Sequence, residues 1–312
     1  MIEAVNLTKR YGHKTAVDNI SFTVKPGTVT GFLGPNGAGK STTMRMIMGL
    51  DKPTSGTVTV NGHPYRELSA PLCEVGALLD AKGLHGSRSA RGHLRQLAAS
   101  NGIPTKRVDE VLEITGLTSV AKKRVKGFSL GMGQRLGIAA ALLGDPGVLL
   151  FDEPVNGLDP EGVKWVRETC RRLAGEGRTV FISSHLMSEM AQTADQLLVI
   201  GRGRILSTGR VDDVIASATT DRVRVASPQA TQLAELMASR NLAARPVAPN
   251  VLETTATTAA TIGELAAQGG IVLHELTTIH ASLEEAYMTL TSDSVEYRTD
   301  PASQAQMQQA QM

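Results

Sequence analysis

A glycine-rich loop is the first stretch of the sequence whose residue types and spacing indicate a chemical task. Residues 34–42 read GPNGAGKST and match the pattern G-x-x-x-x-G-K-S/T. Glycines let backbone N–H groups curl around phosphate oxygens without a clash from a Cβ atom. The pattern predicts that Lys40 reaches the β- and γ-phosphates of a nucleotide and that the Ser41 hydroxyl binds Mg²⁺. The predicted nucleotide-binding residues of this loop are Gly34, Pro35, Asn36, Gly37, Ala38, Gly39, Lys40, Ser41 and Thr42.

A second stretch supplies two carboxylates. Residues 148–154 read VLLFDEP, in which four apolar residues are followed by Asp152 and Glu153. Ligands of open α/β sheets lie at the carboxyl ends of the strands, so we expect both acids at that end. We predict that Asp152 holds Mg²⁺ through water and that Glu153 orients and deprotonates the attacking water. Phosphoryl transfer needs positioning and charge neutralisation more than covalent chemistry, so this set of residues is sufficient for it.

These residues need strands and helices to position them. The sequence predicts strands at 28–33, 148–151, 179–184 and 196–201, and helices at 41–49, 160–174 and 185–194. Strands that alternate with helices indicate an α/β domain with a mainly parallel sheet. Strands expected at 16–24 and within 53–62 add an antiparallel part. A helical pattern over about 87–144 predicts an inserted helical subdomain.

The character of the sequence changes near residue 218. The predicted order β-α-β-β-α-β over 218–291 is typical of a small ferredoxin-like α+β domain. Residues 292–312 are polar and Gln-rich, with little to bury, so we expect them to be disordered. The predicted organisation is an ATP-binding domain at 1–217, an accessory domain at 218–291 and a tail at 292–312.

Composition excludes several classes of protein. The chain has 312 residues, a net charge of +2 and two cysteines, Cys73 and Cys170. The near balance of charge gives no basic bias toward nucleic acid, and two distant cysteines form neither a disulfide framework nor a CxxC zinc site. No run reaches the roughly 18 apolar residues of a spanning helix, and residues 1–12 lack the layout of a signal peptide. We therefore expect a cytoplasmic, soluble protein that can dock on a membrane protein.

Further motifs, in their order along the chain, resemble the ATP-binding subunits of ABC transporters. FSLGMGQR at 128–135 is similar to the signature motif of that family and lies upstream of the Asp-Glu strand, as it does there. NGLD at 156–159 resembles the loop that couples the two ATP sites. The resemblance implies an α/β P-loop ATPase with a RecA-like, mainly parallel sheet, and ATP and Mg²⁺ as cofactors.

The resemblance also implies roles for single residues. Ser129 and Gly131 match signature positions that contact the γ-phosphate of ATP held by the other subunit, and Asp159 belongs to the coupling loop. His185 matches the switch histidine that contacts the γ-phosphate, which together with Lys40 and Glu153 completes the predicted catalytic set. Tyr11 matches the position that stacks on adenine.

Three positions depart from the usual pattern of the family. Leu130 stands where the family usually has Gly, and Gly133 stands where a basic residue is common. Asp80 stands where most members have a Gln that links Mg²⁺ or water to the membrane subunit. We predict that Asp80 still binds Mg²⁺ or water, with altered reach. The acidic residue in this loop, together with the C-terminal extension ending in SLEEAYMTLT, resembles the bacterial branch linked to antibiotic resistance and export, of daunorubicin and bacitracin type.

The resemblance implies partners as well. Because the signature segment comes from a second copy, we expect a head-to-tail homodimer that closes on two ATP molecules. The membrane permease is then a separate polypeptide that contacts the loop after Asp80 and handles the small-molecule cargo. We expect no nucleic acid partner, and a peripheral location on the inner face of the cell membrane. The predicted function is ATP hydrolysis that powers an exporter of drug-like or antibiotic compounds; the alternative is a soluble ABC-family ATPase that regulates a non-transport process.

Overall fold

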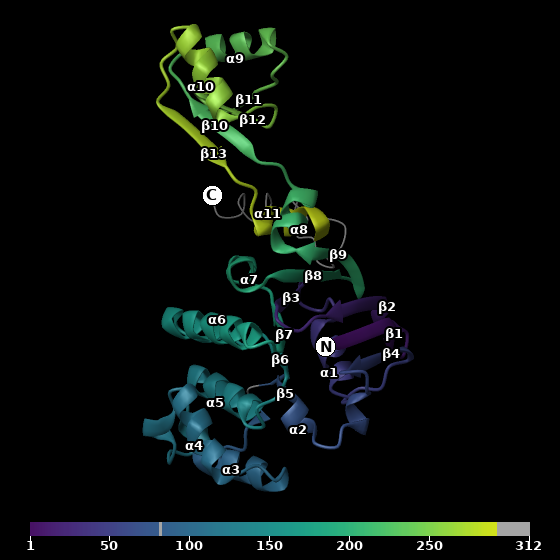
Figure 1. Ribbon diagram of the computed structural model, residues 1–312. Helices are drawn as coiled ribbons and strands as arrows, with labels where there is room; N and C mark the ends of the chain where they lie inside the picture. Colours follow the sequence, from purple (N-terminus) through teal and green to yellow (C-terminus); the bar gives the residue numbers. More distant parts are fainter. Residues whose placement is uncertain (81–82, 292–312) are drawn as a thin grey trace, which may run out of the picture. The chain divides into compact units, whose positions relative to one another are not determined.

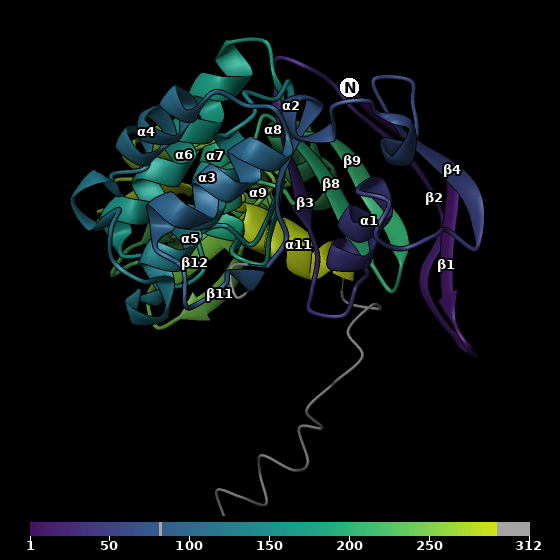
Figure 2. The ribbon, with the colours of Figure 1, turned by 90° about the horizontal axis from the view of Figure 1, so that it is seen from below.

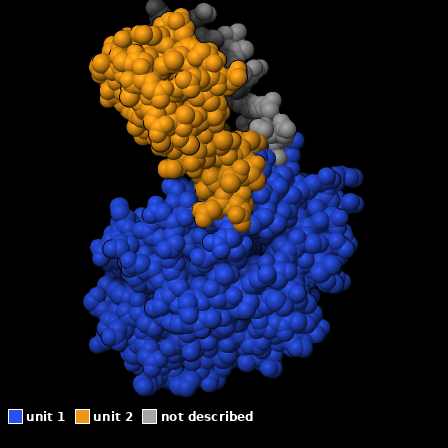
Figure 3. Space-filling model, turned by 45° about the horizontal axis from the view of Figure 1, so that its top comes forward, with its two compact units in different colours: residues 1–211, 290–312 blue, residues 212–289 orange. Residues whose placement is uncertain are grey.

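The structure divides into two compact units. It is a computed structural model that describes residues 1–80 and 83–291, so the predicted tail at 292–312 lies outside the described residues. Unit 1 comprises Met1–Val211 and the residues from Leu290 on, and unit 2 comprises Asp212–Thr289 (Figure 3). Within the described ranges, no helix is both long enough and apolar enough to cross a bilayer.

The centre of unit 1 is a six-stranded sheet in the order β5-β6-β7-β3-β8-β9. All neighbouring strands pair in parallel except β9, which runs antiparallel to β8. The prediction of a mainly parallel α/β sheet is therefore confirmed. The strands are β3 (Val29–Leu33), β5 (Val75–Leu78), β6 (Val148–Asp152), β7 (Thr179–Ser184), β8 (Gln196–Gly201) and β9 (Arg204–Arg210).

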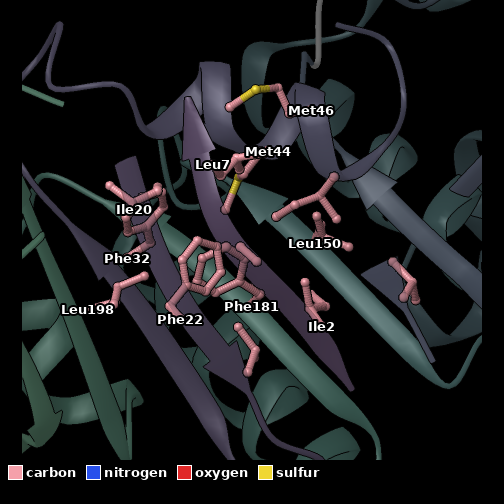
Figure 4. Close-up of a cluster of buried hydrophobic side chains, with 14 of the residues drawn as sticks. Ile2, Leu7, Ile20, Phe22, Phe32, Met44, Met46, Leu150, Phe181 and Leu198 are labelled. Carbon is pink, nitrogen blue, oxygen red and sulfur yellow. The ribbon is translucent and has the colours of Figure 1, made fainter. Parts of the chain in front are cut away.

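A second, antiparallel sheet lies beside the first and has the order β2-β1-β4. Its strands are β1 (Ile2–Tyr11), β2 (Lys14–Val24) and β4 (Ser55–Val60). The main core of unit 1 fills the space between the two sheets (Figure 4). Three of the five phenylalanines meet there, with the Phe181 ring centroid 5.2 Å from that of Phe32 and 5.9 Å from that of Phe22. Burial of these rings and of the surrounding aliphatic side chains holds the sheets together.

Helices cover both faces of the six-stranded sheet. In Figure 1, α6 (Pro160–Gly175) and α7 (Met187–Thr193) lie on one face, and α1 (Lys40–Ile47) lies on the other with the three-stranded sheet. A short helix, α2 (Pro71–Glu74), leads into β5, and a 3₁₀ turn spans Tyr65–Glu67.

Three further helices form the predicted helical subdomain (Figure 2). They are α3 (Ala90–Ser100), α4 (Thr105–Ile114) and α5 (Leu130–Leu142), with 3₁₀ turns at Thr118–Val120 and Val125–Gly127. Helix α5 approaches β5 so closely that a Cβ atom on Gly76 would lie 2.0 Å from the carbonyl oxygen of Ala141. The Arg135 guanidinium lies 4.6 Å from the ring centroid of Trp165 on α6 and donates a hydrogen bond to the carbonyl of Thr115. These contacts fix the subdomain to the rest of unit 1.

Unit 2 contains a four-stranded antiparallel sheet in the order β11-β12-β10-β13. Helices α9 (Ala230–Ser239) and α10 (Ala259–Gln268) pack on one face of this sheet. Val223 and Val225 of β10 form a hydrophobic cluster there with Leu233 of α9 and Ile262 of α10. The last strand begins at Glu275, after the apolar run IVL at 271–273. In chain order the elements are α8 (Val211–Ala218), β10 (Arg222–Ala226), α9 (Ala230–Ser239), β11 (Arg245–Ala248), β12 (Val251–Thr254), α10 (Ala259–Gln268), β13 (Glu275–Ile279) and α11 (Leu283–Thr291).

Candidate functional site

The chemically interesting residues of unit 1 lie at one edge of its parallel sheet. Strands β6, β7 and β3 are neighbours and run in the same direction, so their carboxyl ends lie side by side. The glycine-rich loop follows β3. Asp152 is the last residue of β6 and Glu153 comes directly after it, and His185 follows β7. We call this region the catalytic edge: Lys40, Asp152, Glu153, Ser183 and His185.

The glycine-rich loop is held close to the rest of unit 1. A Cβ atom on Gly39 would lie 2.6 Å from the carbonyl oxygen of Ala16, and Gly39 has a φ of 109°, a conformation that only glycine adopts readily. A Cβ atom on Gly34 would lie 2.5 Å from the carbonyl oxygen of Ile200. Helix α1 begins at Lys40, so its free N–H groups and its positive dipole end face the loop. The loop therefore has the features of an anion-binding site.

Lys40 links this loop to the carboxylates. Its buried Nζ donates hydrogen bonds to the carbonyls of Gly34, at 2.6 Å, and Pro35, at 3.2 Å, and lies 3.8 Å from Oε1 of Glu153. Burial lowers the pKa of Lys40, while the Glu153 carboxylate acts in the opposite direction. The ammonium group is thus a point charge directed at the loop and the base, and phosphate oxygens are suitable acceptors for it.

Glu153 lies between two other functional groups. Its Oε2 is 2.7 Å from Nδ1 of His185, while its Oε1 faces Lys40. Its backbone φ is 50°, which is uncommon for a residue with a side chain and turns the chain sharply after β6. The structure therefore brings together the three residues predicted to be catalytic, Lys40, Glu153 and His185.

Ser183 fixes both acids and was not identified from the sequence. Its hydroxyl donates a short hydrogen bond to Oδ1 of Asp152, and its oxygen accepts the backbone N–H of Glu153 at 3.0 Å. In the register of β6 and β7, Asp152 lies beside Ser183. The sequence predicted both strands but not their register, and this pairing depends on the register.

The predicted magnesium ligands are hard oxygen donors. Ser41 is exposed in the first turn of α1, and Asp152 is an ionisable carboxylate at the end of β6. The described residues contain no group of three or more His, Cys, Asp or Glu that could hold a metal. That fits Mg²⁺ bound to a nucleotide, which uses one or two protein oxygens together with phosphates and water. Asp80 lies in an exposed loop after β5.

The signature residues form the start of helix α5. Ser129 is the N-cap of α5 and its Oγ accepts the N–H of Met132 at 3.2 Å, so Leu130 and Gly131 lie in the first turn. Leu130 is 54% exposed and lies over Gly157, where a Cβ atom would be 2.1 Å from Cδ2 of Leu130. The missing Cβ of Gly157 therefore leaves room for the Leu130 side chain. Gly157 also has a φ of 74°, which independently favours glycine at this position.

Gln134 connects the signature helix to the catalytic edge. Its side chain is buried, and its Nε2 lies 3.3 Å from the carbonyl oxygen of Asn156 and 3.5 Å from that of Glu153. Asp159 is the N-cap of α6 and accepts the N–H of Gly162 at 2.9 Å. No hydrogen bond or ion pair among the described residues joins Ser129, Gly131 or Asp159 to the phosphate loop of the same chain.

Tyr11 lies at the end of β1 with a half-exposed ring. Its hydroxyl donates a hydrogen bond to Oδ2 of Asp51 at 2.9 Å, and Nζ of Lys9 lies 4.9 Å from the ring centroid. Burial, followed by the Asp51 carboxylate, raises the pKa of Tyr11, while a hydrogen bond with Thr42 acts in the opposite direction. The phenol is therefore adjacent to Thr42 in the phosphate loop.

Comparison with known proteins places this geometry in context. A family model described as "ABC transporter" matches residues 17–156, and one described as a domain of unknown function, DUF8746, matches 221–284. One solved structure, described as the ATP binding subunit of an ABC transporter, is 26% identical with a TM-score of 0.64. The alignment covers 70% of this chain and 92% of that one.

Curated relatives extend over most of the chain. An uncharacterized ABC transporter ATP-binding protein of Bacillus subtilis (strain 168) is 36% identical, over 95% of this chain and 97% of that protein. A bacitracin transport ATP-binding protein of Bacillus licheniformis is 46% identical, over 66% of this chain and 68% of that protein. A daunorubicin resistance ATP-binding protein of Streptomyces coeruleorubidus is 34% identical, over 91% of this chain and 94% of that protein.

Proposed function

The chain belongs to the ABC transporter ATP-binding proteins, and from that premise we propose that it powers a separate membrane subunit that exports drug-like or antibiotic compounds. The family membership makes it an ATP-binding subunit and an ATPase. Export rests on the relatives named for bacitracin transport and daunorubicin resistance. One observation carries the catalytic part of the proposal: the Glu153 carboxylate is bonded to His185 on one side and faces Lys40 on the other.

The proposed chemistry assigns one task to each residue of the catalytic edge. Lys40 and the N–H groups of the phosphate loop neutralise the β- and γ-phosphates of ATP. Glu153 accepts a proton from the attacking water, and His185 holds the Glu153 carboxylate in position and reaches the γ-phosphate. Mg²⁺, held by Ser41 and Asp152 and assisted by Asp80, supplies charge neutralisation at the phosphates. Tyr11 stacks on adenine.

A second copy of the chain completes each site in this proposal. Ser129 and Gly131 start a helix whose N-terminal dipole suits a γ-phosphate, yet among the described residues no hydrogen bond or ion pair joins them to the phosphate loop of their own chain. We infer that two chains pair head to tail, so that Ser129, Gly131 and Asp159 face the ATP of the other chain. The ATP-driven closure of this homodimer moves the permease, and hydrolysis releases it.

The permease is proposed to contact the loop that contains Asp80 and the helical subdomain formed by α3, α4 and α5. The chain then lies on the cytoplasmic face of the cell membrane. The compound exported is selected by the permease, so its chemical class comes from the named relatives alone.

A resistance assay tests the proposal. The chain and its membrane subunit are expressed together in a bacterium sensitive to bacitracin and daunorubicin, and survival is measured against each compound. We expect the wild-type pair to raise the tolerated concentration of at least one compound and the Glu153→Gln pair to leave it unchanged. Equal sensitivity with both pairs, at equal expression, would contradict export of these compounds.

A further inference from the structure

The helical subdomain carries a disproportionate share of the positive charge of the chain. Residues 83–127 contain nine Lys or Arg against three Asp or Glu, whereas the whole chain has a net charge of only +2. No Asp or Glu occurs between Glu113 and Asp145. Neither the proposed catalytic chemistry nor the signature segment uses these cations.

Six of the cations lie on two segments that run side by side. Residues 86–91 and 121–126 pair through backbone hydrogen bonds from Arg91 N to Ala121 O, Ala90 N to Lys123 O, Val125 N to Arg88 O and Lys126 N to Gly86 O. Ser89 and Arg124 form an isolated antiparallel bridge between the same segments. Arg91 is ion-paired with Asp109. We call the other five cations of this pair the basic ribbon: Arg88, Lys122, Lys123, Arg124 and Lys126.

The basic ribbon is not neutralised by nearby acids. Two of the three carboxylates at 83–127 are paired with cations outside the ribbon, Asp109 with Arg91 and Glu110 with Lys106 and Arg107. Within the described ranges, none of the five ribbon residues makes an ion pair or a side-chain hydrogen bond. Four of them are exposed, and Arg88 is half-buried.

The positive charge also affects a neighbouring imidazole. His93, on α3, has a lowered pKa, chiefly because it is buried and in addition because Arg88 and His85 repel a proton there. The ribbon therefore maintains a local positive potential, and its fixed backbone holds the charges on one short stretch of surface.

We propose that the basic ribbon binds the anionic headgroups of a lipid bilayer. Three of its five members are lysines, whose compact charges suit a flat anionic surface better than the bidentate recognition of a single carboxylate. A cluster of four to eight cations is the usual composition of a surface that binds anionic lipid. Nucleic acid is disfavoured, because Phe128 is the only aromatic residue within 83–135 and it is half-buried.

The expected strength follows from the number of charges. Each Lys or Arg near an anionic membrane contributes about fivefold in affinity at physiological ionic strength. Neutralising two of them should therefore weaken binding about 25-fold. The attraction should also fall steeply as salt rises, since exposed charges are screened over a Debye length of about 8 Å at physiological salt.

Co-sedimentation with vesicles tests the proposal on the full chain with Mg²⁺ and ATP. Vesicles of phosphatidylcholine alone are compared with vesicles that contain about one third phosphatidylglycerol. The wild type should sediment only with the anionic vesicles, and Lys122→Gln/Lys123→Gln should bind about 25-fold more weakly. The matched control Lys164→Gln/Arg171→Gln removes the same charge from exposed positions of α6 and should bind as the wild type does.

Two further measurements distinguish binding to a membrane surface from binding of a single phosphate group and from effects of ATP turnover. Soluble glycerol phosphate at the same headgroup concentration should not displace the chain, because it lacks the multivalent surface. The Glu153→Gln chain should bind the vesicles as the wild type does, so this test does not depend on ATP turnover or on a transported compound.

Equal binding by the ribbon and control variants would overturn the proposal. So would a wild-type chain that remains in the supernatant with anionic vesicles at low salt, in which case an acidic protein segment becomes the better candidate for this surface. A thermal melt of each variant ensures that any loss of binding is not a loss of fold, and the salt dependence of the wild type gives a readout that needs no variant.

Discussion

The catalytic edge of unit 1 and the sheet of unit 2 both carry charged side chains, but they hold them differently. At the catalytic edge, Glu153 and Asp152 each have partners fixed by neighbouring strands, and Lys40 is buried. In unit 2, Arg222 and Arg224 lie on the sheet face away from α9 and α10, with ion pairs of 3.7 Å to Glu253 and 3.8 Å to Glu275.

The difference follows from strand direction. Parallel neighbours bring the ends of remote segments to one edge, where a few polar groups converge, whereas an antiparallel sheet distributes alternate side chains over a face. Convergence of polar groups can support chemistry, whereas dispersed ion pairs on a partly exposed sheet face contribute little even to stability. We therefore expect substitutions at the catalytic edge to change turnover and substitutions on the unit 2 sheet to leave it unchanged.

The largest effect is expected at Glu153. Glu153→Gln removes the proton acceptor but keeps the shape, so kcat for ATP hydrolysis should fall about 100- to 10,000-fold while ATP still binds. Phosphate release and nucleotide binding are measured on the same preparation. Glu161→Gln, an exposed acid in the first turn of α6, is the matched control and should keep full turnover. Undiminished hydrolysis by Glu153→Gln would show that Glu153 is not the catalytic base.

A smaller effect is expected at Ser183. Ser183→Ala leaves the Asp152 carboxylate and the Glu153 N–H without their partner, so the Mg²⁺ concentration that half-saturates the ATPase should rise about 10- to 100-fold. A Mg²⁺ titration measures this. Ser184→Ala removes an equally buried hydroxyl that instead accepts the N–H of Leu186. It should leave Mg²⁺ dependence unchanged, and an equal shift in both variants would show that Ser183 acts only through stability.

A several-fold effect is expected at Gln134. Gln134→Leu removes the donor that faces the carbonyls of Asn156 and Glu153, so kcat should fall several-fold with KM for ATP unchanged. Gln134→Glu keeps the shape but directs a carboxylate at the same carbonyls, so it should be at least as harmful. If Gln134 only fills space, Glu will be tolerated better than Leu.

The smallest effect is expected in unit 2, where pH makes it measurable. A hydrogen bond from Arg222 holds the pKa of Glu285 below its ordinary value. The pair therefore stabilises unit 2 above the ordinary carboxyl pKa, and that contribution is lost as pH falls through the lowered value. The difference in melting temperature between the wild type and Arg222→Ala should shrink from neutral pH to pH about 3. ATPase activity at neutral pH should not change.

Arg240→Ala is the control for that experiment. Arg240 is exposed at the end of α9 and makes no ion pair among the described residues. Its substitution should give a difference in melting temperature that does not depend on pH. A pH-dependent difference of the same size in both variants would contradict the role assigned to Arg222.

Local pattern was enough to predict most of the catalytic edge. The phosphate loop and the Asp-Glu pair each follow an apolar strand. The glycines around Lys40 reflect a backbone conformation that favours glycine, as the φ of 109° at Gly39 shows. A single histidine forms no sequence pattern, so local pattern alone could not identify His185. It was identified through a family resemblance and its position after a strand.

Contacts between remote segments could not be predicted in the same way. The pairing of Ser183 with Asp152 depends on strand register, and the approach of Gln134 to Glu153 depends on how α5 packs. Strands β1, β5 and β9 were also missed, because β5 is only four residues long and β1 alternates poorly around a bulge. The identity of the strand neighbours is a tertiary property, and single-segment patterns contain little of it.

The stacking of Arg135 on Trp165 has an optical consequence. Trp165 is the only tryptophan of the chain, so its fluorescence arises from one place, the contact between α5 and α6. A cation over the indole face shifts and quenches emission, and any rotation of the helical subdomain would alter that contact. The native chain thus contains its own fluorophore for following subdomain motion during a turnover cycle, without a label.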